Sequence, residues 1–236
     1  MKWEDQSTVF YGNFSQAEAY CKDLTLDGIS DWRVSSLKEF WYLADRSRSN
    51  PAINSIFQNT QNNYYWSNQS VTYSSYESYN WTVYFAEGYN SWLDRSTSNY
   101  TRCVAGESRY EDINYSRDDS KNLVTDNSNG LMWADKTSAN SMTWESAKTY
   151  CSDLSFGGYS DWRLPTIYEL YSITDQRKTT SPFVNSNFRN ISSSWYWSST
   201  ISKNYSSLSR FVHFDVGFDD WNIQTDRYFV VCVRDL

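Results

Sequence analysis

The sequence has little of the side-chain chemistry that most enzymes use. Its 236 residues include one histidine, His213, and no Cys-x-x-Cys pair or histidine cluster that would predict a metal site. A Ser-His-Asp arrangement would exist in one half of the chain only, and a glycosidase-like carboxylate pair stays open because any two of 28 acidic residues could meet. We therefore expect a non-catalytic protein.

Basic residues and long apolar runs are also scarce. The 21 Lys and Arg against 28 Asp and Glu give a net charge of −7 and a pI near 4.8, which argues against nucleic acid as a ligand. No window approaches the 18 consecutive apolar residues of a membrane span, so we expect no membrane insertion. Residues 1–30 lack the pattern of a signal peptide, so any export signal would lie upstream of this numbering.

Leu, Ile and Val are few, whereas aromatic residues make up 19% of the chain. A packed core must therefore be built largely from Trp, Tyr and Phe, with many tyrosines left at the surface. This aromatic content also excludes a disordered chain.

The chain contains an internal duplication with an offset of 129 to 131 residues. The matching positions are Trp3 and Trp133, Cys21 and Cys151, Asp31-Trp32-Arg33 and Asp161-Trp162-Arg163, Tyr65-Trp66-Ser67 and Tyr196-Trp197-Ser198, Gly88 and Gly217, and Cys103 and Cys232. We therefore predict two homologous domains, residues 1–107 (copy one) and 108–236 (copy two), with a polar join near residues 106–110.

The two copies differ at their starts. Residues 110–131 precede Trp133 and are typical of an opening strand and turn, whereas two residues precede Trp3. Copy one is thus expected to lack its opening strand. Either the chain is a fragment of a longer polypeptide, or a strand from elsewhere completes the first sheet by edge pairing, which would be a route to self-association.

Each copy is predicted to be two helices followed by an antiparallel β region, an α+β arrangement. Asn13 with Gln16, and Thr143, are the candidate caps of the first helices. Capping boxes at 36–39 and 166–169 begin the second helices, which should run to about Asp45 and Asp175. Strands are expected at residues 81–85, 210–216 and 228–233.

Four cysteines divide two per copy, at separations of 82 and 81 residues. A bond from the first helix to the last strand, Cys21 to Cys103 and Cys151 to Cys232, would close a loop of about 80 residues and contribute roughly 4 to 5 kcal/mol on the chain-entropy model. The alternative is four buried, reduced thiols. Disulfides would place the protein in an oxidising, extracytoplasmic location.

Several motifs of copy two resemble the bacterial DUF1566 family, also called the C-terminal domain family of the Legionella collagen-like adhesin. They are Gly-Leu-Met-Trp at 130–133, Ala147-x-x-x-Cys151-x-x-Leu154, the run from Gly157 to Thr166, Glu169-Leu170, the run from Tyr196 to Thr200, and the run from Val231 to Arg234. Copy one keeps the skeleton but has Val34-Ser35-Ser36 where the family pattern has Leu-Pro-Thr.

The resemblance implies a C-type-lectin-like fold in each copy and a role at the bacterial cell surface, often as the distal module of an adhesin or fibre. Some relatives bind sulfated glycosaminoglycans. The net charge here is −4 in residues 1–107 and −3 in the remainder, so neither half offers a strong basic face.

The repeated Asp-Trp-Arg and Tyr-Trp-Ser motifs are interpreted as structural. Trp32 and Trp162 are expected to anchor the core, and Arg33 and Arg163 to pair across the turn into the second helix or to hold loop carbonyls, because buried charge requires a partner. The tryptophans of the central strand are expected to pack against these anchors; they are Trp66 and Trp197.

The candidate binding surface lies between the Trp-Ser strand and the last cysteine of each copy. Tyr, Ser and Asn interleaved with Trp are typical of adaptable binding surfaces, and aromatic faces also stack on sugar rings. The predicted ligand-binding residues are Tyr73, Tyr76, Tyr79, Trp81, Tyr89, Asn90 and Trp92 in copy one, and Tyr205, Phe218, Asp219, Asp220, Trp221 and Asn222 in copy two. Two sites on one ligand would add avidity.

The leading hypothesis is therefore an extracellular, non-catalytic module that binds a glycan or a protein ligand. One alternative is a structural subunit or cap of an extracellular filament. Another is the variable ligand-binding protein of a diversity-generating retroelement, which often uses this fold.

Calcium is the one cofactor that the sequence leaves open. Four carboxylates gather near Trp221-Asn222 and could supply hard oxygen ligands; they are Asp215, Asp219, Asp220 and Asp226. The alternative is a solvated acidic loop, which the sequence favours because copy one has no such cluster.

Overall fold

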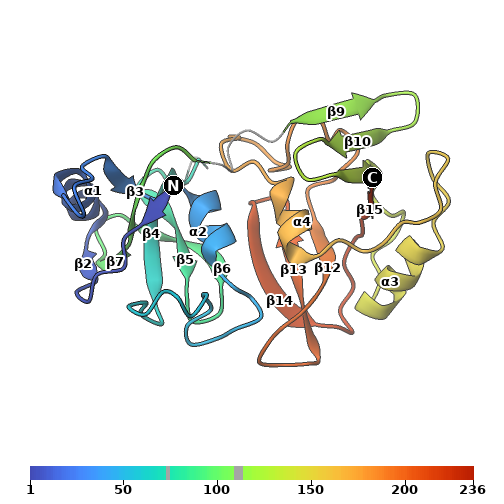
Figure 1. Ribbon diagram of the computed structural model, residues 1–236. Coiled ribbons are helices and arrows are strands. Elements are labelled where there is room, and N and C mark those ends of the chain that lie inside the picture. Colours follow the sequence, from blue (N-terminus) through green and yellow to red (C-terminus); the bar gives the residue numbers. More distant parts are fainter. Residues whose placement is uncertain (73–74, 109–113) are drawn as a thin grey trace. The chain divides into compact units, whose positions relative to one another are not determined.

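The computed structural model describes residues 1–72, 75–108 and 114–236. Clustering of the chain gives two compact units, Met1–Asp112 and Ile113–Leu236. In the described residues each unit has two helices and a larger share of β-structure (Figure 1). The protein is therefore a tandem of two mixed α/β units, as the duplication predicts.

Unit 1 contains two sheets, with strand orders β1-β8-β3 and β2-β7-β4-β5-β6. The strand β4, which carries the Tyr-Trp-Ser motif, lies at the centre of the five-stranded sheet, as predicted. The described elements are β1 (Lys2–Trp3), β2 (Phe10–Gly12), α1 (Phe14–Asp23), β3 (Trp32–Val34), α2 (Leu37–Leu43), β4 (Tyr64–Ser70), β5 (Tyr79–Tyr84), β6 (Tyr89–Asp94), β7 (Asn99–Thr101) and β8 (Cys103–Ala105).

Unit 2 repeats this plan with strand orders β15-β11-β10-β9 and β12-β13-β14. An isolated parallel bridge between Tyr196 and Phe229 takes the place of the β4–β7 pairing between Tyr65 and Tyr100. The described elements are β9 (Tyr115–Asp118), β10 (Leu123–Asp126), β11 (Leu131–Ala134), α3 (Trp144–Ser152), α4 (Ile167–Ser172), β12 (Trp195–Ile201), β13 (Leu208–His213), β14 (Phe218–Ile223) and β15 (Cys232–Asp235).

Three of the four predicted helix caps form as expected. Asn13 makes a capping box with Gln16, and the boxes at 36–39 and 166–169 are both complete. Thr143 occupies the cap position, but its hydroxyl lies 3.0 Å from the Ser146 hydroxyl and caps no backbone N–H. The second helices end earlier than predicted, at Leu43 and Ser172.

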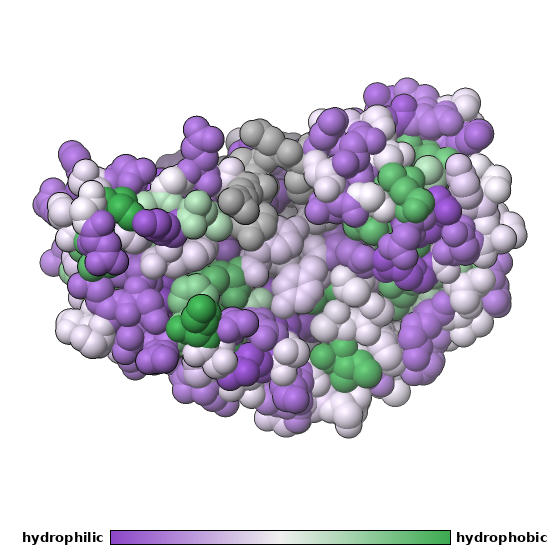
Figure 2. All heavy atoms as spheres, viewed as in Figure 1, coloured by the Kyte–Doolittle hydropathy of each residue, from purple (hydrophilic) through white to green (hydrophobic). Residues whose placement is uncertain are grey.

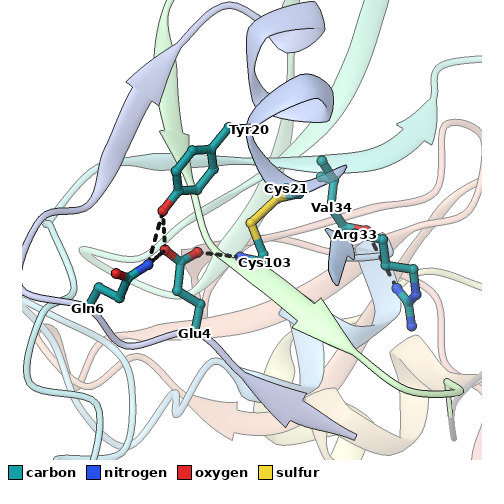
Figure 3. The surroundings of a disulfide bond; sticks show 7 residues. All are labelled: Glu4, Gln6, Tyr20, Cys21, Arg33, Val34 and Cys103. Carbon is teal, nitrogen blue, oxygen red and sulfur yellow. Dashed lines mark hydrogen bonds between the residues drawn. A yellow bond between two sulfur atoms is a disulfide. The ribbon is translucent and has the colours of Figure 1, made fainter. Parts of the chain in front are cut away.

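The disulfides are those expected, Cys21–Cys103 in unit 1 (Figure 3) and Cys151–Cys232 in unit 2. Each joins the first helix of its unit to the last strand. The predicted core tryptophans pack in the same clusters as these cysteines, and none of the four is more than 5% exposed. They are Trp32, Trp66, Trp162 and Trp197. The aromatic core predicted from composition is thus present in both units.

The arginine of each Asp-Trp-Arg motif pairs with the glutamate of the following capping box. Arg33 donates to both carboxylate oxygens of Glu39 at 2.8 and 2.7 Å, and Arg163 does the same with Glu169. The motif therefore fixes the turn into the second helix, as predicted. Although burial alone would raise the pKa of Glu39, hydrogen bonds from Arg33 and the Ser36 backbone hold it below its ordinary value.

Among the described residues, copy one has no counterpart of the segment that opens copy two. Trp3 lies in β1, which pairs with β8 as β11 pairs with β15. The element without a counterpart among the described residues of unit 1 is the β9–β10 hairpin, which continues the sheet beyond β11. The predicted opening strand and turn at 110–131 correspond to this hairpin, so the copies differ by an added ribbon.

The two units neutralise the same carboxylate with different arginines. In unit 2, Arg117 of the hairpin contacts Asp135, whose side chain is fully buried. In unit 1, Arg102 Nη1 lies 2.9 Å from Oδ1 of Asp5, the residue equivalent to Asp135. A basic residue between β7 and β8 therefore replaces the one that the hairpin supplies in unit 2.

Candidate functional site

The predicted binding residues lie on two hairpins, β5–β6 in copy one and β13–β14 in copy two. Three of them point inward: Trp81, Asn90 and Asp219 are at most 1% exposed. In this structure they are core residues and cannot form a contact surface. The prediction included them because it treated these segments as loops, whereas in paired strands alternate side chains face the core. Tyr73 lies outside the described residues.

Several of the other predicted residues form surface ring contacts. Tyr76, which is 37% exposed, has its ring centroid 6.0 Å from that of Trp92 and 5.2 Å from that of Tyr79. In copy two, Tyr205 is 54% exposed, and its ring centroid lies 6.2 Å from that of Trp221. Their role in binding stays a prediction.

A more regular aromatic arrangement crosses three strands of copy one. Tyr64 of β4, Tyr84 of β5 and Tyr89 of β6 stand opposite one another in the sheet. Their ring centroids are 4.5 Å (Tyr64–Tyr84) and 5.2 Å (Tyr84–Tyr89) apart, and the hydroxyls of Tyr64 and Tyr89 are 3.3 Å apart. All three side chains are half-buried. We call this set the copy-one triad.

Copy two has an aromatic triad at the same three positions. Trp195 of β12 stands opposite His213 of β13, which stands opposite Phe218 of β14. The centroid distances are 4.6 Å (Trp195–His213) and 5.2 Å (His213–Phe218). Trp195 is 37% exposed. We call this set the copy-two triad.

Sequence reasoning found only one member of each triad, Tyr89 and Phe218. The other members, Tyr64 with Tyr84 and Trp195 with His213, lie on the two preceding strands. The sequence did contain a sign of these positions. The duplication aligns Tyr64 with Trp195 and Tyr84 with His213, and all four side chains are aromatic. The sequence does not show the strand register that places these three positions opposite one another.

Burial keeps His213 neutral, although a carboxylate lies beside it. Its Nε2 lies 2.7 Å from Asp215 Oδ1, and its ring contacts Trp195 and Phe218. Burial lowers the pKa of His213 to about 4 and raises that of Asp215. The imidazole thus serves as an aromatic ring of the triad at neutral pH.

The acidic residues considered for calcium do not converge. Asp219 is buried, with Oδ2 3.5 Å from Arg210 Nη1, and Asp215 contacts His213. Asp219 and Asp220 are neighbours on β14, so they point to opposite faces. In the part of the chain that the structure describes, no three His, Cys, Asp or Glu side chains are grouped closely enough to hold a metal ion.

Strongly hydrophobic residues appear as separate patches on a largely hydrophilic surface in the view of Figure 2. In the residues 1–72, 75–108 and 114–236, no helix has the length and apolar character needed to span a bilayer. On these observations, one surface feature that the two units share is a small set of aromatic rings held on paired strands.

Comparison with known families supports the duplication directly. The profile of the Lcl C-terminal domain family matches the chain twice, at residues 1–105 and 122–234. No curated protein shows a significant sequence match to the chain. Domains of this matched family occur in adhesin-like surface proteins. The chain therefore belongs to the Lcl C-terminal domain family and carries two tandem copies of its domain.

Proposed function

We propose that the chain is the ligand-binding part of an extracellular adhesin-like protein, and that each copy binds a glycan through its aromatic triad. The proposal rests above all on one observation: the same three cross-strand positions are aromatic and incompletely buried in both copies. Exposed rings that are held rigid provide contact area at little entropic cost, and their faces stack on pyranose rings.

The absence of reactive groups at these sites fits binding without catalysis. The triads contain phenols, an indole, a phenyl ring and a neutral imidazole, and all four cysteines are in disulfides. Disulfide bonds also favour an oxidising location outside the cytoplasm. We further propose that each unit has the C-type-lectin-like fold that its motifs resemble.

A glycan and peptide array with the whole tandem would test the proposal. Variants Tyr89→Ala and Trp195→Ala should each weaken glycan binding at least about tenfold, or ~1.4 kcal/mol, and together should abolish it. Matched controls remove an exposed aliphatic side chain instead: Ile56 is 74% exposed and Ile223 is 44% exposed. Ile56→Ala and Ile223→Ala should leave binding unchanged.

Two results would contradict the proposal. An absence of binding on both the glycan and the peptide array would contradict ligand recognition by this chain. Binding that survives the double triad variant, with the fold intact by circular dichroism, would remove the triads as the contact site. Binding confined to peptides would retain an adhesin-like module but make its ligand a protein.

A structural role in a filament is the second candidate, favoured by the edge of the first sheet. Within the described residues, β11 has a neighbour on each side, whereas β1 pairs only with β8. Trp3 and Phe57 are also partly exposed, whereas the equivalent Trp133 and Phe188 are buried. A strand from another chain could pair here. Electron microscopy of the purified chain at high concentration should show filaments if so, and dispersed monomers would contradict it.

A further inference from the structure

Each copy has a cleft along its first helix, on residues that neither the triads nor the hairpins use. In copy one the cleft has a volume of about 590 Å³, and in copy two about 730 Å³, both within the usual range of ligand sites. All eight lining positions of the copy-one cleft recur in the copy-two cleft at an offset of 130, and four of them keep the same or a similar side chain: Tyr20 and Tyr150, Asp23 and Asp153, Leu24 and Leu154, and Thr25 and Ser155.

Core packing explains only half of this shared set. Tyr20 and Leu24 pack against the core around the Cys21–Cys103 disulfide, and their counterparts do the same in copy two. In contrast, Asp23, Thr25 and their counterparts are exposed. Core packing therefore does not account for the similarity of the exposed half of the set.

The shared aspartate is unfavourably placed for helix stability. Asp23 is the last residue of α1, and Asp153 is the C-cap of α3. A carboxylate at a helix C-terminus opposes the helix dipole. Among the described residues no cation lies within ion-pairing distance of either one, and the carboxylate of Asp153 contacts the Ser152 hydroxyl at 3.4 Å. Both copies thus keep an acceptor that does not stabilise the fold.

The chemistry of the cleft defines the ligand. Its shared polar groups are a carboxylate and a hydroxyl, beside a tyrosine ring and a leucine side chain. The Tyr20 hydroxyl is already engaged, because it donates to Glu4 (Figure 3), so this residue offers its ring. A carboxylate accepts hydrogen bonds from vicinal hydroxyls but repels sulfate and carboxylate groups.

We infer that these paired clefts bind an uncharged saccharide, with Asp23 and Asp153 accepting hydrogen bonds from vicinal sugar hydroxyls and Tyr20 and Tyr150 contacting the ring face. This inference rests on the proposed glycan-binding function and adds a second pair of sites with a defined ligand charge. It also predicts that sulfated glycans are excluded from the copy-one cleft, whose lining contains no basic residue, whereas the copy-two cleft is lined by Arg227 as well as Glu145.

The experiment uses the whole tandem labelled with ¹⁵N and two probes of equal length, a cellohexaose and a heparin hexasaccharide. Cellohexaose should shift the backbone amide signals of residues 20–25 and 150–155. Heparin hexasaccharide should leave the signals of residues 20–25 unshifted. The double variant Asp23→Ala/Asp153→Ala should raise the Kd for cellohexaose at these signals at least tenfold. The control Glu18→Ala/Glu107→Ala removes the same charge outside both clefts and should leave that Kd unchanged.

The outcomes separate this inference from the proposed function. An unchanged Kd in the aspartate variant, or cellohexaose shifts confined to the triads, would contradict saccharide binding in the clefts. Glycan binding by the triads would remain supported. Shifts at residues 20–25 with heparin hexasaccharide would overturn the charge assignment. If neither probe shifts any signal and the glycan array is also silent, the proposed function fails together with the inference.

Discussion

Replacing Glu39 by glutamine should destabilise unit 1 by about 2 kcal/mol. The variant keeps the size of the side chain but loses the charge that receives two hydrogen bonds from Arg33. Hydrogen bonds to a charged group contribute about 1.5 to 3 kcal/mol each, and Glu39 is fully buried. Because the Arg33 side chain is 35% exposed, solvent screening lowers the total below the roughly 3 kcal/mol minimum of that sum, to about 2 kcal/mol.

The matched change in unit 2, Glu169→Gln, should cost less, about 1 kcal/mol. The Glu169 side chain is 18% exposed, and Arg163 keeps a second partner, because its Nη2 lies 2.8 Å from Asp235. A second carboxylate therefore still neutralises Arg163 in this variant. Urea unfolding followed by tryptophan fluorescence, fitted with one transition per unit, measures both costs.

The pH dependence gives a further check on the same pair. The folded pKa of Glu39 lies below its ordinary 4.5, so the stabilisation is complete above that value and is lost as the pH falls through the lower folded pKa. The difference between wild type and Glu39→Gln should shrink over this range. Equal costs in the two units, or a difference that stays constant down to pH 2, would refute the reasoning.

Three other changes have definite expected outcomes. Cys21→Ser/Cys103→Ser should lower the unfolding free energy of unit 1 by roughly 2 to 4 kcal/mol, measured by urea titration, with unit 2 unaffected. Burial lowers the pKa of His213 from 6.5 to about 4. The unfolding free energy of the wild type should therefore fall by up to about 3 kcal/mol between pH 6.5 and pH 4, and that of His213→Phe should not show this loss. Thermal melts across this pH range measure the difference. Arg117→Ala leaves the buried Asp135 without its cation and should cost unit 2 about 3 kcal/mol by urea titration; a loss below 1 kcal/mol would contradict it.

The fold features that the sequence predicted depend on local or repeated patterns. The capping boxes lie within four residues, and the disulfides follow from two cysteines per copy at nearly equal separations. The buried tryptophans, such as Trp66, recur at the duplication offset. Each of these signals is present in the linear order of residues, so no knowledge of tertiary packing was needed.

The candidate site was less predictable because it depends on pairing between strands. Tyr64, Tyr84 and Tyr89 come together only when β4, β5 and β6 adopt their particular register. Likewise, Trp81 is buried because its face of β5 packs towards α2, whereas its composition alone is typical of a binding surface. The exchange of Arg117 for Arg102 could not be predicted either, since the two residues occupy unrelated positions in their units.

The placement of the disulfides has a mechanical consequence for each unit. In unit 1 the bond joins residues 82 positions apart, so a force that pulls on the two ends of the unit passes through the sulfur atoms and bypasses the enclosed chain. Without the bond, that segment could extend by about 280 Å. Each disulfide therefore limits how far its unit can lengthen under tension, and the strands bearing the aromatic triads, which lie within the enclosed segments, do not carry the load.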